Sequence, residues 1–275
     1  MEKGTIKIAR IVTTEKNLMN NEKIDTRMVM LQTACKKLSN HVDVIQTAGG
    51  YIQLYLDFNG CPTGERSTEK DFTRVTAEAE KLLSASIAKV ADNCRLKASF
   101  VTLGVDVNDN NDTESHAELV TTYSFEEKKF IYWTGKSYPV AFQAKTLLYC
   151  IDLESHLQEI AGYRVIVLGC HDLNMFSPRT RANVNRSSYK GKVIRKFDSL
   201  VIKYSPTVVL QHPHFTDTPR IWITGWTGVR RYIGTVDSYS SGIHYENMDG
   251  SEVREPNIIK VLAASKMGKV VDIIL

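Results

Sequence analysis

Apolar residues recur at helical spacing in several segments of the chain. In residues 23–39 and again in 72–90 they fall at every third or fourth position, and residues 191–204 repeat the pattern over a shorter stretch. Trp222 and Trp226 are spaced so that they would share one helical face. This spacing predicts amphipathic helices whose apolar faces are buried in a core or in an oligomer contact.

Runs of β-branched and other apolar residues predict strands between these helices. We expect strands at 5–12, 41–47, 98–106, 116–123, 128–134, 163–169, 205–211 and 269–275. Helices and strands therefore alternate through most of the chain. Because the apolar faces of both must be buried against each other, we predict a layered α/β architecture with mixed sheets, formed by residues 1–275 as a single domain.

The composition excludes several classes of protein. Hydrophobic residues make up 43% and charged residues 24%, which is ordinary for a globular protein with a core. The net charge of +4 is small and scattered, so we expect no nucleic-acid partner. No apolar run approaches the roughly 18 residues of a membrane span, so we expect no membrane partner. The 5 cysteines form no CxxC pair, which favours reduced thiols in a cytoplasmic protein.

Reactive side chains follow the predicted strand at 163–169. The strand ends in a glycine, after which Cys170, His171 and Asp172 come in a row. In α/β folds, active sites form at the carboxyl ends of strands. Free backbone N–H groups in the turn would stabilise a thiolate and an oxyanion. The alternative is a buried cysteine that acts as a small hydrophobe.

A second candidate, Lys136, follows the predicted strand at 128–134 in the segment FIYWTGKSYP. If its side chain points into the same site, it would lower the pKa of the thiol and stabilise a tetrahedral oxyanion. If it does not, it is a solvated lysine in a loop.

The segments GKSYP and GYRVIVLGCHD, in this order, resemble the motifs of the nitrilase-type carbon–nitrogen hydrolases. The resemblance implies a four-layer α-β-β-α sandwich. It also implies that Cys170 attacks an amide or a nitrile, of which we favour a small amide, and forms a covalent acyl-type intermediate. Lys136 and the backbone N–H of His171 would hold the oxyanion, and a glutamate would act as general base.

That glutamate has no counterpart in this chain. Aligning the segment DVIQTAG with the family places Gly49 at its position. A general base typically contributes about 10²–10⁴-fold to the rate, so its loss matters. Three explanations stay open, one of which is a different alignment of this segment with the family. Glu65 or Asp172, or the adjacent His171, replaces the base, or the protein is catalytically silent and uses the fold to bind a ligand or a protein partner.

Two histidines follow the predicted strand at 205–211. His212 and His214 lie at strand-like spacing, with Asp217 downstream, and we expect the two histidines to line a substrate pocket. A metal-dependent hydrolase with His and Asp ligands is an alternative, but the D-x-H and G-D-x-x-D motifs of the metallophosphatases are missing. We predict no metal and no cofactor.

Together these features predict a cysteine-dependent hydrolase whose partner is a small-molecule, amide-like substrate or ligand. We also expect a homodimer or larger homo-oligomer.

Overall fold

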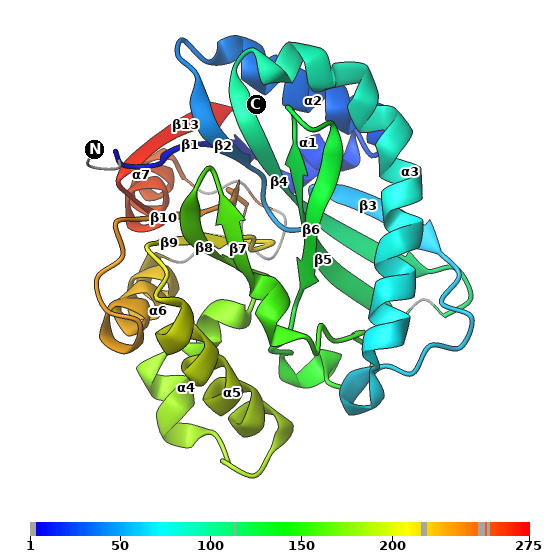
Figure 1. Cartoon of the computed structure of the whole chain (residues 1–275), viewed down its shortest axis with the longest axis vertical. Coiled ribbons are helices and arrows are strands. Elements are labelled where there is room, and N and C mark those ends of the chain that lie inside the picture. Colours follow the sequence, from blue (N-terminus) through cyan, green and yellow to red (C-terminus); the bar gives the residue numbers. More distant parts are fainter. Residues whose placement is uncertain (1–3, 113, 216–218, 247–250, 252–253) are drawn as a thin grey trace.

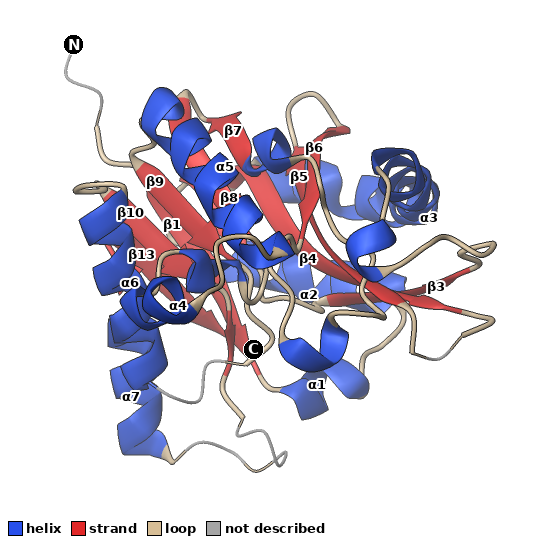
Figure 2. Ribbon diagram, turned by 90° about the horizontal axis from the view of Figure 1, so that it is seen from below, coloured by secondary structure: helices blue, strands red, loops and turns tan. Residues whose placement is uncertain are grey.

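The computed structural model describes residues 4–112, 114–215, 219–246, 251 and 254–275. Two β-sheets face each other in the middle of the molecule, and helices cover their outer faces (Figures 1 and 2). The order of the layers is therefore α-β-β-α. The prediction of a four-layer sandwich with mixed sheets is confirmed.

The larger sheet is mixed, with the order β11-β1-β2-β4-β5-β6, β13 beside β1 and β3 beside β4. Its strands are β1 (Lys7–Thr13), β2 (Val42–Gln46), β3 (Ile52–Leu56), β4 (Ala98–Asp109), β5 (His116–Ser124), β6 (Lys129–Gly135), β11 (Ile243–His244) and β13 (Lys269–Ile274). β4, β5 and β6 form an antiparallel meander at one side of the sheet, whereas β1, β2 and β4 run parallel.

The smaller sheet has the order β12-β10-β9-β8-β7. Its strands are β7 (Leu157–Ile160), β8 (Tyr163–Leu168), β9 (Val208–Gln211), β10 (Ser238–Ser241) and β12 (Lys266–Met267). Because β8, β9 and β10 are parallel, their carboxyl ends lie at one edge.

Helices form the two outer layers. They are α1 (Glu15–Met19), α2 (Ile24–Lys37), α3 (Glu69–Arg95), α4 (Pro178–Asn183), α5 (Tyr189–Tyr204), α6 (Pro219–Tyr232) and α7 (Glu255–Ala264). α2 and α3 pack on the larger sheet, and α5 and α6 on the smaller one. Among the helices in the described ranges, none is long and apolar enough to cross a membrane.

β8 shows how the layers arise from alternating side chains. Val165 and Val167 belong to the core between the two sheets, whereas Ile166 and Leu168 belong to the core under α5 and α6. Successive side chains of a strand point to opposite faces, so a strand that is apolar at every position is buried on both sides. Trp226 of α6 lies in the same outer core, 3% exposed.

Each predicted helix and strand is present, with ends shifted by a few residues. The sequence pattern missed β3, α1, α7 and the short strands β7, β10, β11 and β12. β10 has the sequence Ser-Tyr-Ser-Ser, in which hydroxyl groups are buried by neighbouring strands rather than by their own hydrophobicity. Such a strand gives no apolar signal.

Candidate active site

Cys170 lies two residues beyond the carboxyl end of β8, at the start of a turn that leads into a short 3₁₀ helix, Asp172–Met175. Gly169 precedes it and touches the segment that carries Lys136. A Cβ atom on Gly169 would lie 3.2 Å from the backbone N and 3.1 Å from the Cα of Lys136. The glycine therefore allows the two loops with candidate catalytic residues to pack against each other.

Asp172 joins the same two loops. Its buried carboxylate accepts hydrogen bonds from the backbone N–H groups of Ser137 at 3.0 Å, Tyr138 at 2.8 Å and Gly169 at 2.9 Å. These bonds fix the path of the chain after Lys136 and before Cys170. The carboxylate of Asp172 is thus engaged by three backbone donors.

Lys136 is buried, with 1% of its surface exposed, and is not a solvated loop residue. Its Nζ donates to the Oε1 atom of Glu118 at 2.8 Å and to Oε1 of Gln143. An ammonium group has three donors, so one N–H is left for another acceptor. A buried cation held in this way can stabilise a developing oxyanion.

Glu118 of β5 is a carboxylate at the site that the sequence analysis did not identify. Burial alone would raise its pKa, but the charges of His214 and Lys136 and the hydrogen bonds from Lys136 and Gln143 lower the pKa to about 2. Glu118 is therefore ionised at neutral pH. Its Oε2 atom is buried, accepts no hydrogen bond from the described residues and lies 3.7 Å from Nδ1 of His214.

His214 connects Cys170 to two carboxylates. Its Nε2 atom lies 2.8 and 3.0 Å from the two oxygens of Asp106, and its backbone N–H donates to the sulfur of Cys170 at 3.4 Å. The sulfur, a ring nitrogen of His214 and a carboxylate oxygen of Glu118 all lie within 4.8 Å of one another. In space, a cysteine is followed by an imidazole and then by a carboxylate that orients the imidazole, as in other pairs of a nucleophile and a base.

The charges of the site favour an ion pair between Cys170 and His214. Burial raises the pKa of the Cys170 thiol. The charges of His171 and His214, and hydrogen bonds from both, outweigh burial and lower the pKa of the thiol to about 5. Burial lowers the pKa of His214, but Asp106, Glu118 and Cys170 raise it well above its ordinary value. At neutral pH, a thiolate therefore faces an imidazolium.

Gly49 makes room for this imidazole. A Cβ atom on Gly49 would lie 2.7 Å from the carbonyl oxygen of His212 and 3.2 Å from two atoms of the His214 ring. On the next residue, Gly50, a Cβ atom would lie 2.8 Å from a carboxylate oxygen of Asp106. The space in which a side chain at position 49 would begin is thus occupied by the loop that carries His214.

The other predicted site residues have different surroundings. Glu65 is exposed in a 3₁₀ turn, Gly64–Arg66, and none of the interactions of the described part of the chain brings it to Cys170. His212 is 1% exposed, and burial lowers its pKa to about 3 against a weaker interaction with the backbone of Thr47. Asp217 lies outside the described residues.

His171 follows Cys170 directly. Its backbone N–H donates to no acceptor in the described part of the chain, which leaves it free for another acceptor. Its ring lies 3.4 Å from the side chain of Asn174. No carboxylate among the described residues orients this ring, in contrast to the ring of His214.

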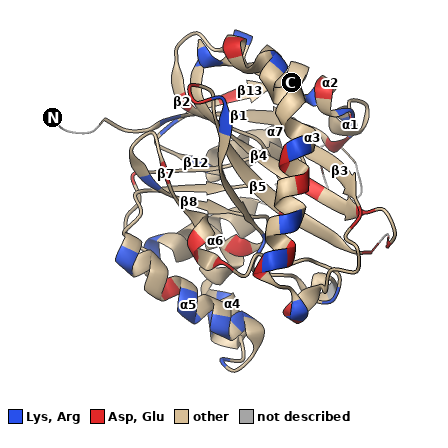
Figure 3. Cartoon of the chain, turned by 45° about the vertical axis from the view of Figure 1, so that its right-hand side comes forward, with Lys and Arg blue, Asp and Glu red and all other residues tan. Residues whose placement is uncertain are grey.

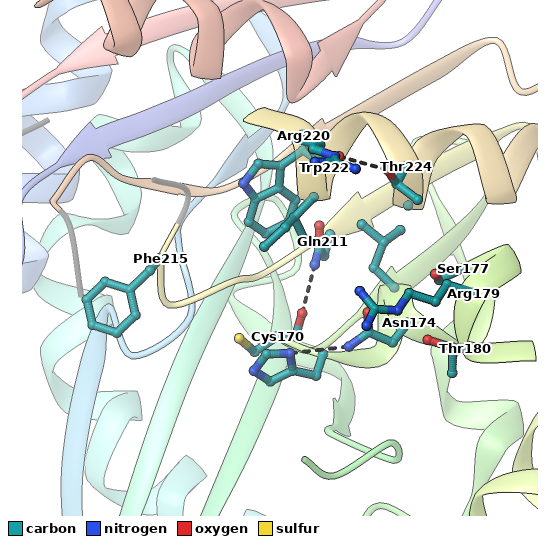
Figure 4. Close-up of a pocket in the computed structure, with 14 residues that line it drawn as sticks. Cys170, Asn174, Ser177, Arg179, Thr180, Gln211, Phe215, Arg220, Trp222 and Thr224 are labelled. Carbon is teal, nitrogen blue, oxygen red and sulfur yellow. Dashed lines mark hydrogen bonds between the residues drawn. The ribbon is translucent and has the colours of Figure 1, made fainter. Parts of the chain in front are cut away.

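A cavity of about 780 Å³ opens beside Cys170 (Figure 4). Its walls come from the loop after β8, from the end of β9 and from α4 and α6, and combine apolar and polar side chains. They include Leu173, Asn174, Arg179, Gln211, Phe215, Arg220 and Trp222. Neither His212 nor His214 is among its lining residues, so the geometry does not place these two on the pocket wall as predicted.

Asp106 and Glu118 were missed because their meeting depends on strand pairing. The two residues lie directly opposite each other in the antiparallel pair of β4 and β5. The sequence carried one usable signal, because Glu118 interrupts the apolar strand segment AELV. A carboxylate inside an otherwise buried strand requires a charged partner, and here Lys136 is that partner.

Comparisons with known proteins agree with this architecture. No protein-family model and no curated protein matches the chain. Among solved structures, a Glu→Gln, Cys→Ala double mutant of the amidase from Nesterenkonia sp. AN1, in complex with acrylamide, aligns with a TM-score of 0.56 at 9% identity, over 92% of this chain and 81% of that one. A second structure of the amidase, with acrylamide added to its active-site cysteine, gives a TM-score of 0.54 at 10% identity, over 90% and 82%.

A third structure, described as an amidase from the nitrilase superfamily with its cysteine replaced by alanine, has a TM-score of 0.51 at 10% identity, over 89% of this chain and 79% of that one. The chain therefore has the fold of the nitrilase-superfamily amidases, as its motifs suggested. At this level of identity, the likeness establishes the fold, and the chemistry must be argued from the site.

Proposed function

We propose that this protein hydrolyses the carbon–nitrogen bond of a small amide, with Cys170 as nucleophile and His214 as the general acid and base. The observation that carries this proposal is the position of His214 between the Cys170 thiolate and Asp106. A nucleophile, a base and a group that orients the base are the parts that nucleophilic catalysis requires.

In the first half of the reaction, the Cys170 thiolate attacks the carbonyl carbon of the amide and forms a C–S bond. The carbonyl oxygen becomes an oxyanion, which the free N–H of Lys136 and the backbone N–H of His171 stabilise. The imidazolium of His214 then donates its proton to the nitrogen as the C–N bond breaks. The amine leaves, and a thioester and a neutral imidazole remain.

In the second half, water replaces the amine. The neutral imidazole of His214 takes a proton from the water as its oxygen attacks the thioester carbonyl, and the same donors hold the oxyanion. The C–S bond then breaks, which releases the carboxylic acid and restores the thiolate. Asp106 keeps the ring of His214 oriented and stabilises its charged form throughout.

This proposal supplies the replacement base that the glycine at position 49 makes necessary. His214 takes the role for which the sequence suggested Glu65 or Asp172. The same geometry counts against a silent binding protein, because binding alone does not require a paired thiolate and imidazolium in a buried site.

A metal-dependent hydrolase is less well supported. The ligand atoms of Cys170, His214 and Glu118 lie close enough to share one ion. However, the ammonium of Lys136 already sits 2.8 Å from the Glu118 carboxylate, and the raised pKa of His214 keeps its ring protonated. Two cations beside the same carboxylate oppose the binding of a third.

The test combines thiol reactivity with turnover. The rate of alkylation of Cys170 by iodoacetamide is measured against pH, with Cys170→Ala identifying the modified site by mass. Ammonia release from small primary amides is then measured with both proteins. We expect an alkylation midpoint near pH 5 and amide hydrolysis that disappears in Cys170→Ala.

A Cys170 that stays inert up to alkaline pH, or ammonia release that persists in Cys170→Ala, would overturn the proposal. Turnover that a metal chelator abolishes and added Zn²⁺ restores would favour the metal-dependent alternative instead.

A further inference from the structure

The cavity beside Cys170 carries two arginines and no acidic residue among its described lining residues. Arg179 comes from α4 and Arg220 from the first turn of α6. In Figure 4, the sulfur of Cys170 lies to the left, Arg179 lies to the right, and Arg220 lies above them. The positive groups and the reactive sulfur thus belong to different parts of one cavity.

Neither guanidinium group has a partner within the described part of the chain. Arg181, two residues after Arg179 on the same helix, shows the contrast. Its guanidinium forms two hydrogen bonds with the carboxylate of Asp198, at 2.8 and 2.5 Å, and lies 3.9 Å from the ring of Tyr232. One arginine of α4 therefore supports the fold, and the other offers its donors to the cavity.

The wider surroundings of the cavity are also positive. Residues 178–204, which include α4 and α5, contain 8 lysines and arginines and 1 aspartate. Figure 3 shows that the Lys and Arg of these two helices lie close together, whereas α3 carries residues of both signs. A surface of one sign around a cavity raises the local concentration of ligands of the opposite sign.

The surroundings of Glu118 favour an amide whose leaving amine is small. The Oε2 atom of Glu118 is buried beside His214 and accepts no hydrogen bond from a described residue. It can accept an N–H of a primary amide, whose nitrogen then faces the proton donor His214. Because Glu118 is only 7% exposed as a residue and 8% exposed by its side chain, little room is left there for a substituent on the nitrogen.

We propose that the substrate is the primary amide of a dicarboxylic acid, with its amide at Cys170 and its free carboxylate bound by Arg179 and Arg220. A planar guanidinium group matches a carboxylate through two parallel hydrogen bonds. Leu173 and Trp222 would pack against the methylene groups between the two ends. This assignment of a substrate class rests on the proposed function.

Kinetics with matched substrates test the proposal. Succinamate, glutaramate and adipamate are compared with the corresponding neutral diamides, in which an amide of the same shape replaces the carboxylate. We expect kcat/KM to favour the carboxylate by about 10- to 100-fold for at least one chain length. In Arg179→Gln with Arg220→Gln this ratio should fall to about one, mainly through KM.

Arg231→Gln provides the matched control, because Arg231 is an exposed arginine of the same helix, α6, outside the cavity lining. We expect it to keep the wild-type ratio. Equal kcat/KM for carboxylate and diamide in the wild type, or a ratio that survives the double replacement, would overturn the carboxylate site.

Binding separates this proposal from the proposed function. Succinamate, glutaramate and adipamate are each titrated calorimetrically into Cys170→Ala, with and without the two arginine replacements. Binding that depends on the arginines, together with a wild-type protein that hydrolyses none of these amides, would support the anion site and refute the hydrolase. Hydrolysis of amides without any dependence on the arginines would do the reverse.

Discussion

The surroundings of His212 and His214 differ strongly, although a single proline separates the two residues. His212 is buried without a carboxylate to pair with, and its pKa is lowered to about 3. His214 faces Asp106 and Glu118, and its pKa is raised well above the ordinary value. One ring stays neutral at neutral pH, and the other is positively charged.

This difference shows that the local pattern does not decide the role of a histidine. In the segment HPH, both residues follow β9 and have equal claims to a functional role. The acids that separate them come from β4 and β5, about a hundred residues earlier in the chain. Nearby charges and desolvation set a pKa, and both depend on tertiary structure.

The largest expected effect is on activity when His214 is replaced. In His214→Asn, kcat/KM for amide hydrolysis should fall by about 10²–10⁴-fold, because the general acid and base is lost. The pKa of the Cys170 thiol should rise toward its ordinary value, which alkylation against pH would measure. Glu65→Gln, at an exposed residue, is the control and should behave as wild type. Wild-type activity in His214→Asn, together with a loss of activity in Glu65→Gln, would contradict the assignment of His214 as the base.

Asp106→Asn should weaken the same pair without removing it. Asp106 is the strongest of the charges that raise the pKa of His214. Without that charge, the imidazolium loses its proton at lower pH, so the alkaline limb of the pH profile of kcat/KM should move down by roughly 1–3 pH units. A profile with an unmoved alkaline limb would mean that Asp106 does not control the charge of His214.

His212 should affect stability in acid rather than catalysis. Its pKa in the folded state lies below the value of 6.5 expected in the unfolded chain, so unfolding takes up a proton. The contribution of His212 to the free energy of unfolding is fully present above pH 6.5 and is lost as the pH drops toward about 3. Between pH 6.5 and 4.5, this loss is about 2–3 kcal/mol, at roughly 1.4 kcal/mol per pH unit.

Urea unfolding of the wild type and of His212→Leu at these two pH values would measure the effect. We expect the variant to lose less stability on acidification than the wild type. The same pH dependence in both proteins would show that His212 does not titrate in this way.

Gly49→Ala should have the smallest effect of the four. The new methyl group would press on the carbonyl oxygen of His212 and on the ring of His214, and overpacking of this kind typically costs about 1–3 kcal/mol. Thermal unfolding and Cys170 alkylation should both report the disturbance. Gly4→Ala is the control, because a Cβ atom there would touch nothing. A Gly49→Ala protein as stable and reactive as the control would contradict the close packing of the loop that carries His214.

Much of the fold could be predicted because the helices and strands of each layer have apolar residues at the spacing typical of a helix or a strand. The strand at β8 and the helices α2, α3 and α5 have apolar positions at the spacing of their own element. β10 had no such pattern, although all of its residues are buried and it pairs with β9 and β12 in the sheet. Elements that depend on neighbours for their burial could not be read in advance.

The residues of the site likewise fall into those that could be predicted from the sequence and those that could not. Cys170 and Lys136 stand at the ends of predicted strands, in short motifs that resemble those of a known family, and the structure brings their loops into contact. Gly49 was predicted to stand where the family has its glutamate, and the loop that carries His214 occupies the space beside it. The residue that fills this space, His214, was identified only as a pocket residue, and Glu118 was not identified at all.

The sequence by itself determined the layers and the ends of the strands that carry Cys170 and Lys136, because side-chain periodicity and turn residues act over a few positions. Only the tertiary structure decided which groups surround the sulfur. The pairing of β4 with β5 places Asp106 beside Glu118, and the absence of a side chain at Gly49 admits the ring of His214. Electrostatic interactions depend on distance in space, and strand pairing and packing set that distance.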